Sequence, residues 1–334
     1  MARPRQPNQR KNYDKLNKRL TRYVLIVQSI YDTLASDIAR AVALTNYDGT
    51  KPFRLRDYPH VRDAFEAAQR DFVADMRTTI QSGISAEWRE SNAVQDLLAT
   101  KALKSYGAQV NSRKYKIYFE PNNAAMRTFM RRKDNGLNLS AKVWKQSRKV
   151  RKELEAAISA AIEKGTSAVT LSKRISKYLH DYPSLAKDYK EKYGTATKAE
   201  DCEYRSIRLA RSEINMAYRT AEQERWRNMD FVLGYEIKLS HKHPKDDECD
   251  ELAGVYPLWF KWTGWHPNDM CYEVPILMSE AEFWSDEPAN RVEEMPENFK
   301  RYVEKYSERI ERQVERGTLP YYLRDNPKAW REAA

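Results

Sequence analysis

Apolar residues near the start of the chain recur at steps of three and four positions. The series from Leu16 to Val42 keeps a period of about 3.6 residues, which predicts a long helix with one apolar face. Turn-forming residues at 46–52 end this pattern. Residues 1–15 are rich in Pro, Gln, Asn and basic side chains without periodicity, so we expect a flexible basic arm there.

The next apolar stripes predict two more helices, one over 61–80 that ends near Gly83 and one over 88–103. Charged and apolar residues alternate over 113–120 (RKYKIYFE), a pattern typical of a short strand. Residues 122–132 return to a helical pattern. Together these elements predict a helical N-terminal domain.

The middle of the chain predicts a helical hairpin. In NGLNLSAKVW, Ser140 is a candidate N-cap for a helix that continues to Gly165. A short second helix follows, capped by Thr166 or Ser167. Residues 182–202 lack a clean period, so we expect an exposed insertion there.

A well-formed helix is expected over about 203–229, where small and medium side chains form a narrow stripe that permits close packing. After Gly234 the pattern alternates, which predicts a strand, and CYEVPILM (271–278) predicts a returning strand. An amphipathic helix is expected over 296–316.

These elements define a fold class that is mainly α. We expect a helical N-terminal domain, a helical hairpin and a small α+β C-terminal module with a candidate zinc site. The expected regions are the basic arm 1–15, the helical domain 16–120, a further domain 121–278 and an acidic helical extension 279–334.

Basic residues are concentrated in the first part of the chain. The 334 residues carry a formal net charge of +11, but residues 241–334 hold 13 basic and 20 acidic residues, whereas residues 1–240 hold 46 and 28. This asymmetry favours an electrostatic partner for the first part, either nucleic acid or an acidic protein surface. No apolar run approaches the roughly 18–20 residues that span a bilayer, and the three cysteines form no disulfide framework, so we expect a soluble protein of a reducing compartment.

Two stretches, 3–22 and 131–152, are strongly basic. Their Lys and Arg side chains could contact phosphates without reading base sequence, although a solvated helix face would have the same composition. The residues that we assign to nucleic-acid contact are Arg3, Arg5, Arg10, Lys11, Arg131, Arg132 and Lys133.

Histidine and cysteine gather in one short segment. Three of the five histidines and two of the three cysteines lie within residues 241–271. A strand, a loop and a returning strand could bring the ends of this segment together, and zinc accepts imidazole and thiolate ligands in tetrahedral Cys₂His₂ sets. The predicted zinc ligands are His243, Cys249, His266 and Cys271.

Other interpretations of this segment stay open. Asp246, Asp247 or Asp269 could replace one ligand, another ion could bind, or the cysteines could simply be buried while His266 packs against tryptophan. The stretch HKHPKDD also holds the residue types of a His-metal nuclease, but the second histidine and the asparagine of such centres are not evident. Phosphate-loop, dinucleotide and hydrolase-elbow motifs are absent from the sequence, so we expect no enzyme.

Several short motifs occur in an order that is informative as a set. They are GLNLSAKVW, EKGTSAVTLSKRI, LARSEINMAYRTAEQE, C-x2-L-x-G from Cys249 to Gly254, and HP-x3-C from His266 to Cys271. Over roughly residues 120–278 this order resembles the Mu-F-like phage head morphogenesis, or minor capsid, family. The family's usual pattern is C-x2-C-x2-L-x-G followed by HP-x-C-x-C, and here Asp246 and Asp269 stand at two of the cysteine positions.

The resemblance implies a head morphogenesis domain at 121–278 in a structural, non-enzymatic minor capsid protein of a tailed phage. It implies partners in the portal protein and other capsid proteins, nonspecific contact with packaged double-stranded DNA, and no membrane in the assembled head. The protein would lie in the capsid interior near the portal, after assembly in the host cytoplasm, and would assist head assembly, DNA packaging or DNA delivery. The alternatives are a metal-dependent nuclease or Mu-F-linked toxin that uses the cluster at 241–271, and a host DNA-binding protein unrelated to virions.

Overall fold

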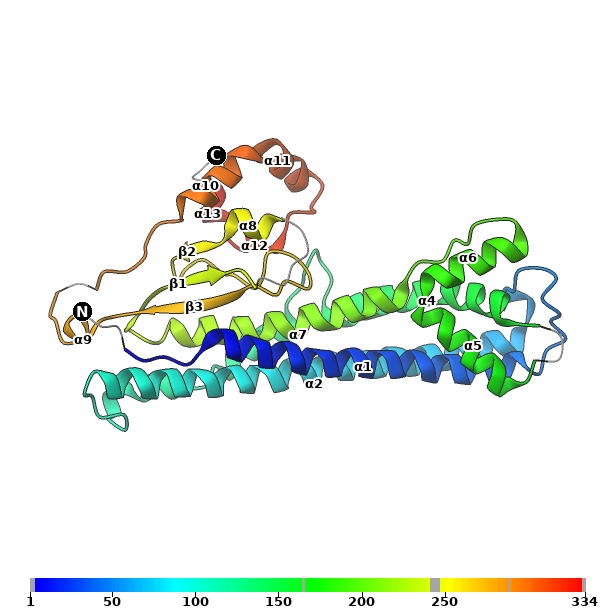
Figure 1. The fold of residues 1–334 in the computed structure, drawn as a ribbon, viewed down its shortest axis with the longest axis horizontal. Coiled ribbons are helices and arrows are strands. Elements are labelled where there is room, and N and C mark those ends of the chain that lie inside the picture. The colour runs from blue at the N-terminus through cyan, green and yellow to red at the C-terminus, as the bar shows by residue number, and fades with distance from the viewer. Residues whose placement is uncertain (1–3, 164–165, 241–246, 288, 332–334) are drawn as a thin grey trace. The chain divides into compact units, whose positions relative to one another are not determined.

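The computed structural model describes residues 4–163, 166–240, 247–287 and 289–331. Helices dominate these ranges. The strands in these ranges form one small antiparallel sheet in the C-terminal half of the chain (Figure 1). This confirms the mainly α fold class with a small α+β module. No helix in the described ranges is long and apolar enough to cross a membrane.

The chain forms two compact units, each assembled from segments that are distant in sequence. Unit 1 comprises residues 1–20, 83–136 and 212–334, and unit 2 comprises residues 21–82 and 137–211. Unit 1 therefore draws on every region that the sequence led us to expect, including the C-terminal extension.

Three long helices contribute residues to both units. They are α1 (Gln9–Val42), α2 (Pro59–Ser105) and α7 (Cys202–Trp226). The predicted first helix and the predicted helix at 203–229 are thus confirmed. Because α1 begins at Gln9, the second half of the expected arm 1–15 is helical.

The long helix α2 replaces two predicted helices. The sequence suggested an end near Gly83, but the helix continues through this residue. Glycine in a helix interior costs only about 1 kcal/mol relative to alanine. Ile80 and Ile84, on either side, are both buried at a helical spacing, so the apolar period is not interrupted. A short 3₁₀-helix, η1 (Leu55–Asp57), precedes α2.

Unit 2 contains the predicted hairpin of α4 (Leu139–Ala161) and α5 (Ala168–His180), which pack against each other. Ser167 caps α5, as predicted. The N-cap of α4 is Asn138 and not Ser140, because the Asn138 side-chain oxygen accepts a 2.9 Å hydrogen bond from a backbone N–H of the first turn.

The exposed insertion predicted at 182–202 is wrong for its first half. Residues Tyr182–Tyr193 form α6, which packs against α4 and α5. The Asp181 carboxylate caps its start, Gly194 ends it with φ 71°, and Leu185 is buried. One buried leucine is too weak a sequence signal to reveal this helix.

The sheet of unit 1 has the order β2-β1-β3 with antiparallel neighbours. β1 (Val232–Lys238) and β3 (Tyr272–Leu277) are the two predicted strands, and β2 (Gly254–Tyr256) is a short addition. Figure 1 shows α7 along one side of the sheet and α8 (Glu248–Leu252) on the other.

The strand predicted at 113–120 is wrong. Residues Arg113–Phe119 form the 3₁₀-helix η2, which buries Tyr115 and Tyr118. Two aromatic side chains three positions apart share one side of a 3₁₀-helix, so alternation of charged and apolar residues was a misleading signal. The helix predicted at 122–132 is present as α3 (Asn123–Arg131).

The C-terminal extension consists of short helices rather than one long one. The helix predicted at 296–316 is divided at Tyr306, which does not continue the helical backbone. Tyr302 and Ile310 on its two parts are both buried, so the apolar stripe itself was assigned correctly. The helices of this region are α9 (Glu280–Phe283), α10 (Glu297–Lys305), α11 (Ser307–Glu315), α12 (Tyr321–Arg324) and α13 (Pro327–Arg331).

Candidate metal centre

Three of the four predicted zinc ligands lie in unit 1, where Cys249 is close to His266 in one group of donor atoms and to Cys271 in another. Cys249 belongs to α8, while His266 and Cys271 lie in the loop that leads into β3. The Cys249 Sγ is 3.2 Å from the His266 Nε2. The fourth predicted ligand, His243, lies outside the described residues.

Asp247 joins this group through one of its two carboxylate oxygens. The Oδ1 atom accepts a 2.8 Å hydrogen bond from the Cys249 backbone N–H and thereby caps α8. The Oδ2 atom is 3.3 Å from the His266 Nε2. Asp247, Cys249 and His266 therefore present an oxygen, a sulfur and a nitrogen within 4.8 Å of one another.

A second group of donor atoms contains Cys249, Asp269 and Cys271. Both carboxylate oxygens of Asp269 are already engaged by the backbone of its own loop. Oδ2 accepts from the Trp265 N–H at 2.6 Å, and Oδ1 accepts from the Cys271 N–H at 2.7 Å. We conclude that Asp269 shapes the loop and that the two thiols are the donors of this group.

The orientation of the His266 ring suits a metal ligand. Its Nδ1 lies 3.0 Å from the Pro267 carbonyl oxygen, which can only accept a hydrogen bond, so Nδ1 carries the proton. The Nε2 atom faces the Cys249 thiol at 3.2 Å and an Asp247 carboxylate oxygen at 3.3 Å. A second partner that fixes the ring and its tautomer is the usual arrangement around metal-bound histidine.

The Cys249 thiol is protonated in the absence of a cation. A hydrogen bond with Cys271 and burial raise the pKa of Cys249 well above its ordinary value. A bound divalent cation reverses this preference because it coordinates the thiolate directly. Two thiols, an imidazole and a carboxylate oxygen fit the ligand types of zinc better than those of calcium or magnesium.

Helix α7 holds the loop that carries His266 and Cys271. The fully buried Arg219 guanidinium donates to the carbonyl oxygens of Thr263 at 3.0 Å, Asp269 at 3.0 Å and Cys271 at 2.6 Å. The ring of Trp262 lies 4.3 Å from the guanidinium carbon. These contacts satisfy carbonyl groups that would otherwise be buried without partners.

Two amide side chains on α7 extend this network. Asn215 donates to the Asp269 carbonyl at 2.9 Å. Gln223 donates to the Trp262 carbonyl and to the Glu273 carboxylate, both at 2.8 Å. The sequence indicated that Asn215, on the flank of the apolar stripe, could reach a neighbouring element, but Arg219 and Gln223 were missed because polar positions on a helix are normally assigned to solvent.

The residues predicted to contact nucleic acid differ in their availability. Arg5, Arg10, Lys11, Arg131 and Lys133 are exposed, and Arg3 lies outside the described residues. Arg132 is engaged within unit 1, where it forms a 2.6 Å ion pair with Glu213 and stacks over the Phe129 ring at 3.5 Å. Its guanidinium therefore has a structural role.

A basic hollow in unit 2 was not among the predicted sites. It has a volume of about 300 Å³ and is lined by Lys145, Arg148, Lys149, Lys152, Lys198 and Glu200. Four of these residues lie in the basic stretch at 131–152 and at helical spacing, a signal that the sequence contained. The contribution of the loop around 198–200 could not be read from it.

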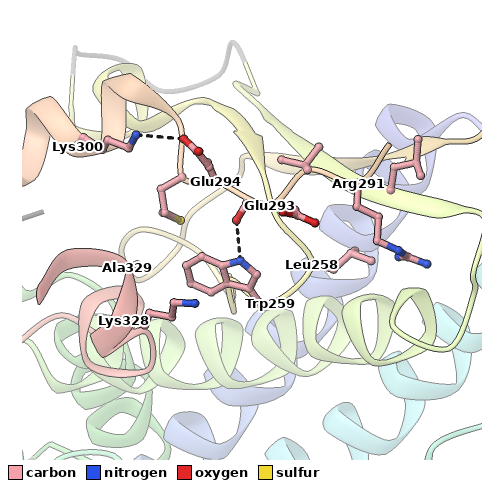
Figure 2. Close-up of a pocket in the computed structure, with 11 residues that line it drawn as sticks. Leu258, Trp259, Arg291, Glu293, Glu294, Lys300, Lys328 and Ala329 are labelled. Atoms are coloured by element: carbon pink, nitrogen blue, oxygen red, sulfur yellow. Dashed lines mark hydrogen bonds and ion pairs between the residues drawn. The ribbon is translucent and has the colours of Figure 1, made fainter. Parts of the chain in front are cut away.

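A larger groove in unit 1 lies beside the half-exposed Trp259 (Figure 2). Its volume is about 910 Å³. The Trp259 Nε1 donates to the Glu293 carbonyl at 3.0 Å, and the Lys328 ammonium lies 5.3 Å from the centre of a Trp259 ring, so the indole forms a fixed wall. The groove also has charged side chains of both signs in its lining, namely Arg291, Lys300, Glu293 and Glu294.

Comparison of the chain with protein-family models, with curated proteins and with solved structures gave no significant match to any of the three. The motifs of the sequence are therefore interpreted through their positions in the fold. The C-x2-L-x-G motif forms α8 and enters β2, and its Cys249 meets His266 of the HP-x3-C motif. LARSEINMAYRTAEQE is the part of α7 that holds this loop through Arg219.

Proposed function

We propose that this chain is a structural minor head protein of a tailed phage, without a catalytic step of its own. Its partners would be the portal protein and other capsid proteins, and packaged double-stranded DNA. In this proposal the protein acts inside the head near the portal vertex, after assembly in the host cytoplasm, and assists head assembly, packaging or DNA delivery.

One observation carries the proposal. Three of the motifs that resemble the Mu-F-like family contact one another in unit 1, whereas the motif residues of α4 and α5 lie in unit 2. Arg219 of the α7 motif donates to the backbone of the loop that carries the HP-x3-C motif, and the Cys249 thiol contacts His266 of that loop. A shared structural centre is the property expected of motifs that belong to one domain rather than of chance matches.

We further propose that the module binds zinc in a structural role. Cys249, His266 and Cys271 would hold the ion with an oxygen of Asp247, and Cys249 is the donor that the two groups of neighbouring atoms share. Zinc in such a set links two segments of chain and adds its binding free energy to the stability of the fold. Here it would join α8 to the loop before β3.

Particle association tests the function directly. The full chain is co-expressed with the portal and major capsid proteins, and particles are separated from free protein by sedimentation. The proposal expects the chain in portal-containing particles, and a variant with Arg219→Met should be incorporated less because its central loop is released. Sedimentation of the wild-type chain wholly apart from particles would reject the proposal.

Nuclease activity is the outcome that would replace this proposal. Purified protein is incubated with plasmid DNA and Mg²⁺, Mn²⁺ or Zn²⁺. A structural protein leaves the plasmid intact with every ion. Metal-dependent cleavage that is lost in a His266→Ala variant would assign the cluster to catalysis instead.

A further inference from the structure

We infer that the basic hollow on α4 is a binding site for the phosphate backbone of double-stranded DNA. This site deepens the proposed function, on which the choice of DNA as the partner rests. The hollow lies entirely within unit 2 and combines one face of α4 with the loop that precedes α7.

The four basic residues from α4 form a continuous ridge. Their positions, 145, 148, 149 and 152, follow the spacing i, i+3, i+4 and i+7 that defines one face of a helix. At a rise of about 1.5 Å per residue the ridge is about 10 Å long. Phosphates along one DNA strand advance about 3.4 Å each, so the ridge matches roughly three successive phosphates.

The single acidic residue in the hollow organises the site. Glu200 accepts hydrogen bonds from Lys149 at 2.9 and 3.2 Å and forms a 2.6 Å ion pair with Arg205. These contacts hold the loop against α4. Lys145, Arg148, Lys152 and Lys198 form no ion pair with any residue that the structure describes, which leaves their charge available to a ligand.

The charge of unit 2 points the same way. Its two segments hold 25 basic and 17 acidic residues, a net of +8 out of +11 for the whole chain. The excess lies in residues 137–211, with 17 basic and 9 acidic residues, whereas residues 21–82 are balanced at 8 and 8. The hollow is thus a concentration of charge within the most basic part of the chain.

The lining of the hollow favours DNA over an acidic protein surface. Every described residue that lines it is charged, and five of the six are Lys or Arg. Protein interfaces bury an apolar core and are depleted in lysine, whereas lysine and arginine predominate in contacts with phosphate. A site built of point charges without an apolar anchor should bind DNA of any sequence.

Salt-dependent DNA binding tests the site. Binding of the full chain to short fluorescent duplexes of two unrelated sequences is measured by anisotropy over a range of salt concentrations. The test variant carries Lys145→Gln, Arg148→Gln, Lys152→Gln and Lys198→Gln, and it keeps Lys149 because that residue holds the loop. The matched control removes the same number of charges from exposed positions on α5 and α6 through Lys173→Gln, Lys177→Gln, Lys187→Gln and Lys190→Gln.

The expected results are specific. Each lost phosphate contact lowers the slope of log affinity against log salt by about 0.9, so the test variant should lose about 3 in slope. At about 0.1 M salt this corresponds to a loss of affinity on the order of 100-fold or more, equal for both sequences. The control should stay within about threefold of wild type. Circular dichroism melting of each variant establishes that it is folded.

Three results would overturn the inference: an unchanged slope in the test variant, an equal loss in both variants, or displacement of DNA by polyglutamate at equal charge concentration. The last result would assign the hollow to an acidic protein. Failure of the site is distinguishable from failure of the proposed function. If the test variant still enters portal-containing particles, the head-protein proposal stands whatever the result of the DNA-binding experiment. If the wild-type chain binds DNA through the hollow but never enters particles, the site stands and the head-protein proposal fails.

Discussion

Gly234 of β1 lies so close to Val292 of the C-terminal extension that no side chain fits between them. A Cβ atom at position 234 would be 2.7 Å from the Val292 Cγ2 and 2.9 Å from the Tyr256 carbonyl oxygen. The Val292 N–H donates to the Leu233 carbonyl at 2.9 Å, and the pairing of β1 with β3 is irregular between Val232 and Gly234. Glycine here permits both the irregularity and the close approach of the extension.

Gly234→Ala should therefore lower the free energy of unfolding by about 1–3 kcal/mol, the usual cost of overpacking. Urea denaturation followed by circular dichroism measures this change. Gly254→Ala is the matched control, because the nearest atom to its added methyl group, a side-chain oxygen of Asn298, is 3.3 Å away rather than 2.7 Å. Equal costs for the two substitutions would show that the contact with Val292 is not decisive.

Arg219→Met should destabilise the protein more than any exposed substitution on α7. The variant keeps side-chain volume but removes the Arg219 donor from the buried Thr263 and Cys271 carbonyls and the positive charge beside the buried Asp269 carboxylate, at a cost of roughly 3–5 kcal/mol. Arg219→Lys should fall between the variant and wild type, since an ammonium group can satisfy some of these carbonyls. The exposed Arg208→Met on the same helix should change stability by less than about 0.5 kcal/mol. Similar unfolding free energies for Arg208→Met and Arg219→Met would refute this role.

Much of the fold could be predicted because its apolar positions keep a regular period. The buried series from Leu16 to Val42 gave α1, and the alternation after Gly234 gave β1. The errors occur where local pattern and tertiary context disagree. Gly83 suggested a helix end, but packing on both sides of it preserves α2.

The candidate centre was only half accessible to sequence reasoning. Clustering of rare residues identified Cys249, His266 and Cys271, since a strand and its returning partner bring them together. Asp247 contributes the carboxylate oxygen that lies 3.3 Å from the His266 Nε2, and Arg219 acts on backbone groups of a distant loop. Sequence cannot reveal such contacts, because a backbone carbonyl carries no residue-specific signal.

Purified wild-type protein should contain about one zinc per chain. Cys249→Ser should lose most of this metal, because it removes the thiol that both donor groups share. Cys202→Ser is the control, since Cys202 is also buried but belongs to unit 2. Elemental analysis gives the metal content, and a chelator should lower the Tm of the wild type but not that of Cys249→Ser. Equal zinc in both variants would exclude Cys249 as a ligand.

His180 should titrate above its ordinary pKa. Its Nε2 is 2.8 Å from an Asp32 oxygen, and its Nδ1 contacts the Glu203 carboxylate. Burial alone would lower the pKa of His180, but the two carboxylates outweigh it and raise the pKa above 6.5. The stabilisation from these contacts is then complete below about pH 6.5, the unfolded-state pKa, and is lost as pH rises through the folded pKa.

Titration of the His180 imidazole by NMR measures this shift. Asp32→Asn should lower the midpoint, because it removes one of the two negative charges that face the ring. Asp37→Asn, a half-buried position on the same helix that pairs with Arg40, should leave the midpoint unchanged. A wild-type midpoint at or below about 6.5 would contradict the contact.

Glu222 is a second source of pH dependence, in unit 1. Its carboxylate is fully buried and accepts hydrogen bonds from the Tyr13 hydroxyl at 2.6 Å and the Gln95 amide at 3.1 Å. Burial raises the pKa of Glu222 to about 8, and the opposing effects of Tyr13, Arg219 and Gln95 are smaller. The folded state therefore holds a proton on Glu222 at pH values where the unfolded chain has released it.

Because the folded pKa of about 8 exceeds the ordinary value of 4.5, the stability linked to this proton is complete below about pH 4.5 and declines until about pH 8. The decline should be on the order of 5 kcal/mol. Glu222→Gln cannot ionise, so its free energy of unfolding in urea should fall less between pH 5 and pH 8 than that of the wild type. Glu153, whose burial also raises its pKa to about 8, should leave a residual decline. Glu224→Gln is the control, because Glu224 lies two positions away on the same helix and is half-buried; this variant should keep the wild-type dependence of stability on pH. If Glu222→Gln also kept that dependence, Glu222 would be ionised in the folded protein.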